Sequence, residues 1–248
     1  MLEVKNLCKH YGGIRAVDGA TFTVEKGSIT ALIGPNGAGK TTAFNCISRT
    51  VAPTSGEVWL DGQRIDHLRP HKVTARGLSR TFQISRNLSD MTVIENVIVQ
   101  SRVDGIAGLF KPAMSREEKD KAMSILDFLG ITRIAYEDGN NLSYGQKKLM
   151  DLAALLMSDP KIILLDEPAG GVNPSLLEEI ISHIQALNAR GLTVLIVEHN
   201  MDLIMRLSHR VVVMAQGRVI CDGTPDVVRK DPQVLDAYLG GVLEQEAA

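Results

Sequence analysis

The chain has 248 residues, of which 44% are hydrophobic and 23% are charged, and its formal net charge is −2 at pH 7. This composition is that of an ordinary soluble globular protein with a sizeable core, and so small a net charge gives no support to a nucleic-acid partner. The three cysteines stand far apart without a C-x-x-C pair, which argues against a disulfide framework or a zinc site.

Segments near the start of the chain alternate apolar and polar residues and predict half-buried antiparallel strands at Leu2–Lys5 and Ala20–Val24. Glu57–Gly62 adds a third strand with a turn signal at its end. Together they predict a small antiparallel sheet drawn from both sides of a glycine-rich loop. Tyr11 lies in the predicted loop Lys9–Gly13, where its ring could stack on a nucleotide base or pack at a strand end.

The glycine-rich loop reads G-x-x-x-x-G-K-T, the pattern of a phosphate-binding P-loop. The apolar run Ile29–Ile33 before it predicts a buried strand, and Thr41–Ser48 can continue as a helix, which is the context that the motif requires. Backbone N–H groups and the helix N-terminus favour phosphate here, Lys40 can reach the β and γ phosphates, and the Thr41 hydroxyl can hold Mg²⁺. The predicted nucleotide-binding residues are Gly34, Pro35, Asn36, Gly37, Ala38, Gly39, Lys40, Thr41 and Thr42.

From about residue 67 to residue 157 the periodicity is mostly helical. The capping-box pattern from Ser115 to Glu118 predicts a helix that ends near Gly130. This central part of the chain is therefore expected to differ in architecture from the parts on either side of it.

The segment Leu142-Ser143-Tyr144-Gly145-Gln146 precedes an amphipathic helix. Ser143 and Gln146 satisfy the capping-box pattern, so one interpretation is a well-capped helix without a ligand. Gly145 favours another interpretation, because glycine in a first helical turn costs stability unless something approaches the backbone closely. A serine and a glycine at a helix N-terminus would make a second anion site.

Beyond residue 160, strand and helix patterns alternate. Ile162–Leu165 and Thr193–Val197 predict strands that are covered on both faces. Asn173-Pro174 predicts the start of a helix that Gly191 ends. Val211–Met214 and Arg218–Ile220 predict a closing hairpin. The tail Pro225–Leu239 predicts two short helices.

Polar groups follow three of the predicted strands: the P-loop, Asp166-Glu167 and His199. A carboxylate pair after a strand is often only a solvated strand end, and a lone histidine is more often structural. In an open parallel sheet, however, ligands bind beyond the carboxyl ends of the strands, so three such ends favour a site. Asp166 is placed to hold Mg²⁺ or its waters, Glu167 to polarise the attacking water, and His199 to hydrogen-bond the γ-phosphate.

Together these residues resemble the ATP-binding cassette (ABC) ATPase family along essentially the whole chain. Gly34–Thr42 matches Walker A, Ile162–Glu167 matches Walker B with its catalytic glutamate, and 142–146 matches the family signature with tyrosine in place of its first glycine. The resemblance implies that Gln83 is the Q-loop residue, with a catalytic role and a contact to Mg²⁺. It also implies that Asn173 ends the D-loop, where aspartate is common.

The same resemblance implies that His199 is the switch histidine and that Tyr11 stacks on adenine. It implies an α/β fold in a single ABC ATPase domain, with a P-loop (RecA-like) core and an antiparallel β subdomain in about 1–83 and 158–224. A helical subdomain would occupy about 84–157 and a helical tail about 225–248.

ATP and Mg²⁺ would be the cofactors. A second ATPase subunit, identical or related, would complete a head-to-tail dimer in which Ser143, Gly145 and Gln146 of one chain approach the γ-phosphate held by Lys40 of the other.

A narrower resemblance is to the LivG-type ATPase of branched-chain amino-acid importers. The segments that carry it are Gly77–Gln83, Met91–Val97, Glu167–Pro174, Glu198–Met201 and Ala237–Gly240. It implies a bacterial amino-acid importer with transmembrane permease subunits contacting Gln83–Val97 and a periplasmic binding protein as an indirect partner. Other members of this group import urea or amides or export lipopolysaccharide, so these remain alternative substrates for the transporter.

The sequence begins without a signal peptide and has no apolar run near the ~18 to 20 residues that cross a bilayer, so we expect a cytoplasmic protein. The importer resemblance would place it peripherally on the cytoplasmic face of the inner membrane. Functions of other classes fit less well. A soluble ABC ATPase acting on DNA or ribosomes would have long coiled coils or two cassettes, and a small-molecule P-loop kinase would not need the segment 142–146.

Overall fold

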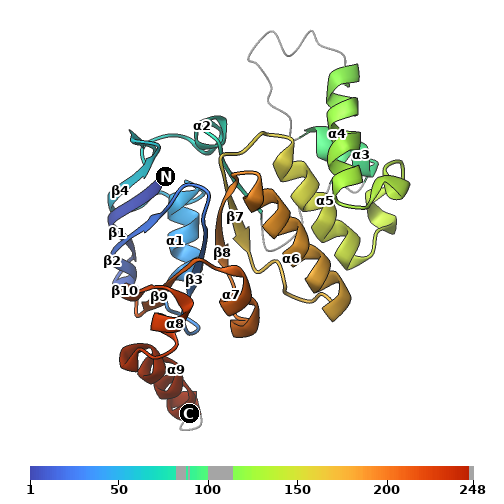
Figure 1. Ribbon diagram of the computed structural model, residues 1–248. Coiled ribbons are helices and arrows are strands. Elements are labelled where there is room, and N and C mark those ends of the chain that lie inside the picture. The colour runs from blue at the N-terminus through green and yellow to red at the C-terminus, as the bar shows by residue number, and fades with distance from the viewer. Residues whose placement is uncertain (82–87, 89, 100–113, 246–248) are drawn as a thin grey trace.

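The computed structural model describes residues 1–81, 88, 90–99 and 114–245, which are shown in colour in Figure 1. The elements follow in the order β1 (Leu2–Tyr11), β2 (Ile14–Val24), β3 (Ile29–Ile33), α1 (Lys40–Ile47), β4 (Ser55–Leu60), β5 (Gln63–Arg64), α2 (Pro70–Ala75), β6 (Leu78–Arg80), α3 (Val93–Val99), α4 (Arg116–Phe128), the short 3₁₀ helices η2 (Thr132–Ile134) and η3 (Gly139–Asn141), α5 (Tyr144–Leu156), β7 (Ile162–Asp166), α6 (Pro174–Ala189), β8 (Thr193–Val197), α7 (Met201–Leu207), β9 (Arg210–Ala215), β10 (Arg218–Gly223), α8 (Pro225–Val228) and α9 (Pro232–Gln245).

The strands form two sheets. One is antiparallel with the order β2-β1-β4-β5, and the other has six strands in the order β10-β9-β3-β8-β7-β6. In the six-stranded sheet β6, β7, β8, β3 and β9 are parallel, and β10 closes the edge antiparallel to β9. Every residue of β3, β7 and β8 is buried, as their continuous apolar runs predict. The carboxyl ends of these three strands therefore lie at one edge of the sheet.

Helix α1 is packed between the two sheets (Figure 1). Phe44 and Ile47 of α1 belong to a buried cluster that includes Val4 of the antiparallel sheet and Leu164 and Val212 of the six-stranded sheet. Fully burying a side chain of this size contributes roughly 1.5 to 3 kcal/mol. Because both sides of α1 are covered, the loop before it is held in one position relative to the sheet.

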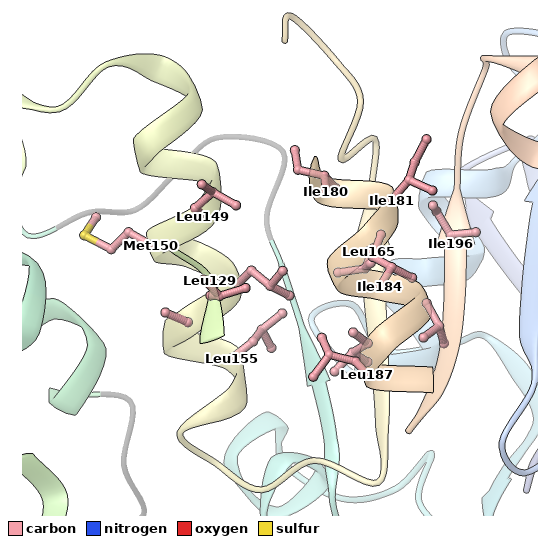
Figure 2. Packing of buried hydrophobic residues seen from close by; sticks show 14 of the residues in the cluster. Leu129, Leu149, Met150, Leu155, Leu165, Ile180, Ile181, Ile184, Leu187 and Ile196 are labelled. Atoms are coloured by element: carbon pink, nitrogen blue, oxygen red, sulfur yellow. The ribbon is translucent and has the colours of Figure 1, made fainter. Parts of the chain in front are cut away.

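A second buried cluster joins the other face of the six-stranded sheet to the helices. Figure 2 shows α6 lying between α5 and the strands, with Ile181 beside Ile196 of β8 and with Leu149 and Leu155 projecting from α5. The buried face of α6 consists of Ile180, Ile181, Ile184 and Leu187, which recur at helical spacing in the sequence. This packing fixes the helical region against that face of the sheet, beside the ends of β7 and β8, where Asp166 and His199 lie.

The structure differs from three of our predictions. Strand β6 lies within the region predicted to be mostly helical, where it pairs with β7 at the sheet edge. It has three residues, too few to establish a period in the sequence. Helix α9 extends to Gln245, beyond the predicted short helix. Tyr11 is the last residue of β1 rather than a loop residue, and it pairs with Ile14 across the turn at Gly12-Gly13.

None of the described helices is both long enough and apolar enough to span a bilayer.

Candidate active site

The P-loop connects β3 to α1, and its backbone conformation requires glycine. Gly34, Gly37 and Gly39 have φ values of 149°, 78° and 96°, which side chains rarely adopt. A Cβ at Gly34 would lie 2.0 Å from the carbonyl oxygen of Met214, and one at Gly39 would lie 2.2 Å from that of Ala16. At these two positions the protein's own backbone excludes a side chain, which is a second reason for glycine beside the predicted approach of phosphate.

We predict that Gly39→Ala weakens the binding of a fluorescent ATP analogue by about tenfold or more, a change equivalent to about 1.4 kcal/mol. The new methyl group must move either the loop or the strand that carries Ala16, and both position the phosphate-binding N–H groups. Gly62→Ala is the matched control, because Gly62 also has a positive φ, its Cβ would meet nothing within 4 Å, and it lies in the turn between β4 and β5, outside the P-loop. Equal affinities for the two variants would contradict this argument.

Lys40 is buried within the loop. Its ammonium donates to the carbonyl oxygens of Gly34 and Pro35 at 2.7 and 2.9 Å. Burial lowers the pKa of Lys40 from its usual value, and the Glu167 and Asp166 carboxylates oppose that change. The three charged groups are thus close enough to interact although they come from different strand ends. Thr41 and Thr42 follow in the first turn of α1.

Asp166 is the last residue of β7 and is tied to a residue that we did not predict. Its Oδ2 atom lies 2.8 Å from Nη2 of Arg80, and the two side chains are only 3% and 6% exposed. Arg80 also donates to Asn45 Oδ1 on α1 at 2.7 Å and to Oγ of Ser48, the C-cap of that helix, at 3.0 Å. The arginine at the end of β6 therefore connects the Walker B strand to the P-loop helix. The sequence carries no clear signal for this residue, because β6 has only three residues, Leu78–Arg80.

Glu167 and His199 are brought together, as the convergence of strand ends predicts. His199 Nε2 lies 2.8 Å from Glu167 Oε1. Glu167 has a φ of 48°, in the left-handed region that non-glycine residues seldom occupy. Its N–H donates to the carbonyl of Val197 on β8, and its own carbonyl accepts from Lys148 Nζ on α5. Strained backbone of this kind persists where neighbouring contacts hold it, and such positions cluster at active sites.

The predicted Mg²⁺ ligands are oxygen atoms, which is the ligand type that Mg²⁺ prefers. Asp166 ends β7 and Thr41 lies in the first turn of α1, so both lie by the P-loop. Gln83, the third predicted ligand, lies outside the described residues. The Thr41 hydroxyl and the Asp166 carboxylate therefore fit the chemistry of a magnesium site.

A second group of potential ligand atoms lies on the β1–β2 hairpin. The donor atoms of Cys8, His10 and Asp18 are within 4.8 Å of one another. Asp18, however, accepts from Arg218 at 2.7 Å and lies 3.7 Å from Arg15. A metal ion here would face two guanidinium groups, so we assign no metal to this group.

The segment 142–146 forms a capped helix start. Ser143 is the N-cap of α5, with Gln146 N donating to Ser143 Oγ at 3.3 Å and Ser143 N donating to Gln146 Oε1 at 2.8 Å. A Cβ at Gly145 would lie 2.1 Å from a methyl carbon of Leu176 on α6, so a larger residue there would require the Leu176 side chain to move.

Ser143, Gly145 and Gln146 line a groove of about 610 Å³ beside α4 and α6. Figure 1 shows α5 on the opposite side of β7 and β8 from α1. Within one chain, the signature segment is therefore separate from the P-loop, and a role for it in ATP binding remains a prediction.

One tyrosine is predicted to contact the nucleotide, and another contacts the P-loop. Tyr11 is 48% exposed, so its ring is accessible to a base, although Lys9 Nζ lies over the ring, 4.8 Å from its centroid. Tyr238 of α9 was not predicted as a site residue. Burial raises the pKa of Tyr238, and a hydrogen bond from the backbone N–H of Gly34 opposes that change. The sequence offered only the tail segment Ala237–Gly240 as a family feature.

The predicted permease contact, Gln83–Val97, lies partly outside the described residues. Its described part contains the start of α3, and Leu88 and Met91 are exposed there. Asn173 is the N-cap of α6, with its Oδ1 accepting from Leu176 N at 2.9 Å.

Known proteins resemble this chain over nearly its whole length. The ABC transporter family model matches residues 17–170, and the model of a branched-chain amino acid ATP-binding cassette transporter matches residues 218–243. The chain is 40% identical to the high-affinity branched-chain amino acid transport ATP-binding protein BraF of Pseudomonas aeruginosa, over 97% of this chain and 98% of that protein. It is 37% identical to the corresponding protein LivG of Escherichia coli K12, with the same coverage.

Solved structures give the same result. An ATP-binding cassette of an ABC transporter in its ADP conformation has a TM-score of 0.86 at 35% identity, covering 97% of this chain and 98% of that one. A dimeric bacterial ABC transporter cassette has a TM-score of 0.78 at 28% identity, covering 91% of this chain and 99% of that one.

Proposed function

The chain belongs to the ABC transporter family as one of its ATP-binding and ATP-hydrolysing cassettes, and on that basis we propose that it powers a bacterial importer of branched-chain or other amino acids. The family and the fold predicted from the sequence are confirmed by the same comparisons. The observation that carries the importer proposal is the tail, where residues 218–243 match the branched-chain amino acid model. BraF and LivG, which match nearly the whole chain, are both named for transport of these amino acids.

ATP is expected to lie along Gly34–Thr42, with its adenine against the exposed ring of Tyr11. The Lys40 ammonium would exchange its two carbonyl partners for the β and γ phosphates. Thr41 and Asp166, with Gln83, would hold Mg²⁺, which when bound neutralises charge on the phosphates.

Glu167 would accept the proton of the attacking water as general base. Its carboxylate is hydrogen-bonded to His199, which keeps the side chain at the strand end. When ATP is bound, His199 would hydrogen-bond the γ-phosphate in place of Glu167, so its contacts would depend on whether the γ-phosphate is present.

We expect one P-loop to be half of a complete site. Ser143 and Gly145, which lie apart from the P-loop of their own chain, would approach the γ-phosphate held by a second ATPase chain. ATP then favours the closed dimer because it binds that state better, and hydrolysis removes the preference. The dimeric cassette among the similar structures supports this arrangement.

The permease subunits would contact the region Gln83–Val97 and hold the chain at the cytoplasmic face of the inner membrane. A periplasmic binding protein would deliver the substrate to the permease without touching this chain.

The test of the importer proposal is to co-express the chain with the membrane subunits encoded beside it and to measure uptake of labelled leucine and valine into membrane vesicles. ATP-dependent uptake together with co-purification supports the proposal. Failure to co-purify with any permease would remove it, whereas uptake of urea or an amide instead would keep the transporter and change its substrate.

A mixing experiment tests the shared site. Lys40→Ala disables the P-loop of one chain, and Ser143→Arg places a bulky cation in the signature segment of another. Each variant alone should be inactive, but a head-to-tail mixed dimer retains one intact site, so roughly a quarter of wild-type ATPase activity should return on mixing. No recovery with an active wild type would contradict the shared site. If the wild-type chain is inactive alone and gains ATPase activity when a related ATPase is added, its natural partner is a different ATPase chain.

A further inference from the structure

We propose that Glu198 is a positioning residue, which holds the loop containing Glu167 against the loop containing His199. Glu198 follows β8 directly, and it is 4% exposed. Its Oε1 atom accepts from Ala169 N at 2.7 Å, and its Oε2 atom accepts from His199 N at 3.0 Å and Asn200 N at 3.4 Å. The inference deepens the proposed function, because it rests on Glu167 acting in ATP hydrolysis.

The burial of Glu198 is compensated by backbone groups. A buried carboxylate is costly unless hydrogen bonds replace its lost hydration. Among the residues that the structure describes, no lysine, arginine or histidine side chain lies within ion-pair distance of Glu198. Its stabilising partners are therefore the amides of two loops. Since one carboxylate oxygen serves each loop, the loops must stay together for the charge to remain satisfied.

The loop on the Glu167 side needs such support. Glu167 has the left-handed φ of 48°, and the chain turns back on itself, with Gly170 N donating to the Glu167 carbonyl. Ala169, which Glu198 holds, lies inside this turn. Glu198 thus bonds the backbone two residues after the general base.

The other loop carries the partner of that base. His199 N is bonded to Glu198, and His199 Nε2 lies 2.8 Å from Glu167 Oε1. The carboxylate of Glu198 and the Glu167–His199 contact therefore form two links between the same loops, one through backbone and one through side chains. Displacing a reacting group by 1 Å can cost about 10²-fold in rate, so this backbone link is expected to control the position of Glu167.

Glu198→Gln tests the inference, because the amide keeps the shape and replaces one accepting oxygen with a donor. Either Ala169 N or His199 N then faces an N–H group. We expect kcat for ATP hydrolysis to fall by about 10- to 100-fold while KM and the affinity for a fluorescent ATP analogue stay unchanged, since Lys40 and the P-loop are untouched. Glu198→Asp keeps the charge but is one methylene shorter, so it should restore kcat only in part.

The matched control is Asp66→Asn. Asp66 is also a buried carboxylate that accepts from a backbone N–H, that of Val58, but it follows β5 and is paired with Arg64, away from the two loops. This variant should lower the melting temperature without changing kcat. If Glu198→Gln does not fold, Glu198→Asp alone carries the comparison.

A double variant separates positioning from a general effect on the fold. When Glu167→Gln is already present, Glu198→Gln should reduce the remaining hydrolysis little further, because residues that act as a unit are not additive. A wild-type kcat in Glu198→Gln or Glu198→Asp, or full additivity in the double variant, would overturn the inference. A wild-type protein that fails to hydrolyse ATP even with its partner subunits would instead overturn the proposed function.

Discussion

Replacing Glu167 by glutamine is expected to slow ATP hydrolysis by about 10²- to 10⁴-fold, the usual contribution of a general base. Glutamine cannot take a proton from water, yet it preserves the side-chain length and the hydrogen bond to His199. Binding of ATP should be retained, because Lys40 and the P-loop do not change. ATP-dependent dimerisation should persist for longer than in the wild type, since the closed state is no longer resolved by hydrolysis. Phosphate release and size-exclusion chromatography with ATP measure the two effects.

Glu178→Gln is the matched control for this experiment. Glu178 is an exposed glutamate on α6 whose carboxylate pairs with Arg206, away from the P-loop. It should leave hydrolysis unchanged, because the site does not include it. Wild-type hydrolysis in Glu167→Gln would remove Glu167 as the base and would leave His199 as the nearest candidate at the same strand end.

The parts of the fold that could be predicted from the sequence have local causes. The strands at Ile29–Ile33 and Ile162–Leu165 are apolar at every residue except Thr30, because both faces of the sheet are covered. The helices that begin after Ser115, Ser143 and Asn173 are marked by side chains that cap their own N-terminal N–H groups. The conformation of the P-loop is indicated by its glycines, which can adopt the positive φ values that the loop needs. The edge at which the site lies then follows from the order of strands and polar ends.

The contacts that join these pieces could not be predicted, because they connect residues distant in the sequence. Arg80 reaches Asp166 across the pairing of β6 with β7, and β6 is too short for a recognisable pattern. Lys148 reaches the Glu167 carbonyl from a different helix. In the sequence Glu198 is an ordinary polar residue after a strand. Only the structure shows that its carboxylate accepts hydrogen bonds from two loops.

The role of the signature segment, residues 142–146, also could not be decided from the sequence. The sequence left open whether Ser143 and Gln146 cap a helix or bind an anion, and the structure contains both capping hydrogen bonds. A cap does not exclude an anion site, since the N–H groups of the same turn are still available to a ligand. The experiment that decides between them needs a second chain.

Replacing Arg80 by methionine is expected to lower the free energy of unfolding by about 3 to 5 kcal/mol, the cost of leaving a buried charge without its partner. Asp166 would stay 4% exposed without the guanidinium that lies 2.8 Å away. The hydrogen bonds from Arg80 to Asn45 on α1 and to its C-cap, Ser48, would be lost at the same time. Chemical denaturation measures the change, and a smaller stabilisation by added nucleotide would show that the P-loop helix has moved.

Arg206→Met is the control, because Arg206 also pairs with a carboxylate, that of Glu178, but on the surface. Exposed ion pairs contribute little, so its unfolding curve should match that of the wild type. Adding Asp166→Asn to Arg80→Met should recover part of the lost stability, because no unpaired charge then remains buried. If Arg80→Met were as stable as Arg206→Met, the buried pair would not be what joins the Walker B strand to the P-loop helix. The packing of Phe44 and Ile47 between the sheets would then be sufficient to hold α1 in place.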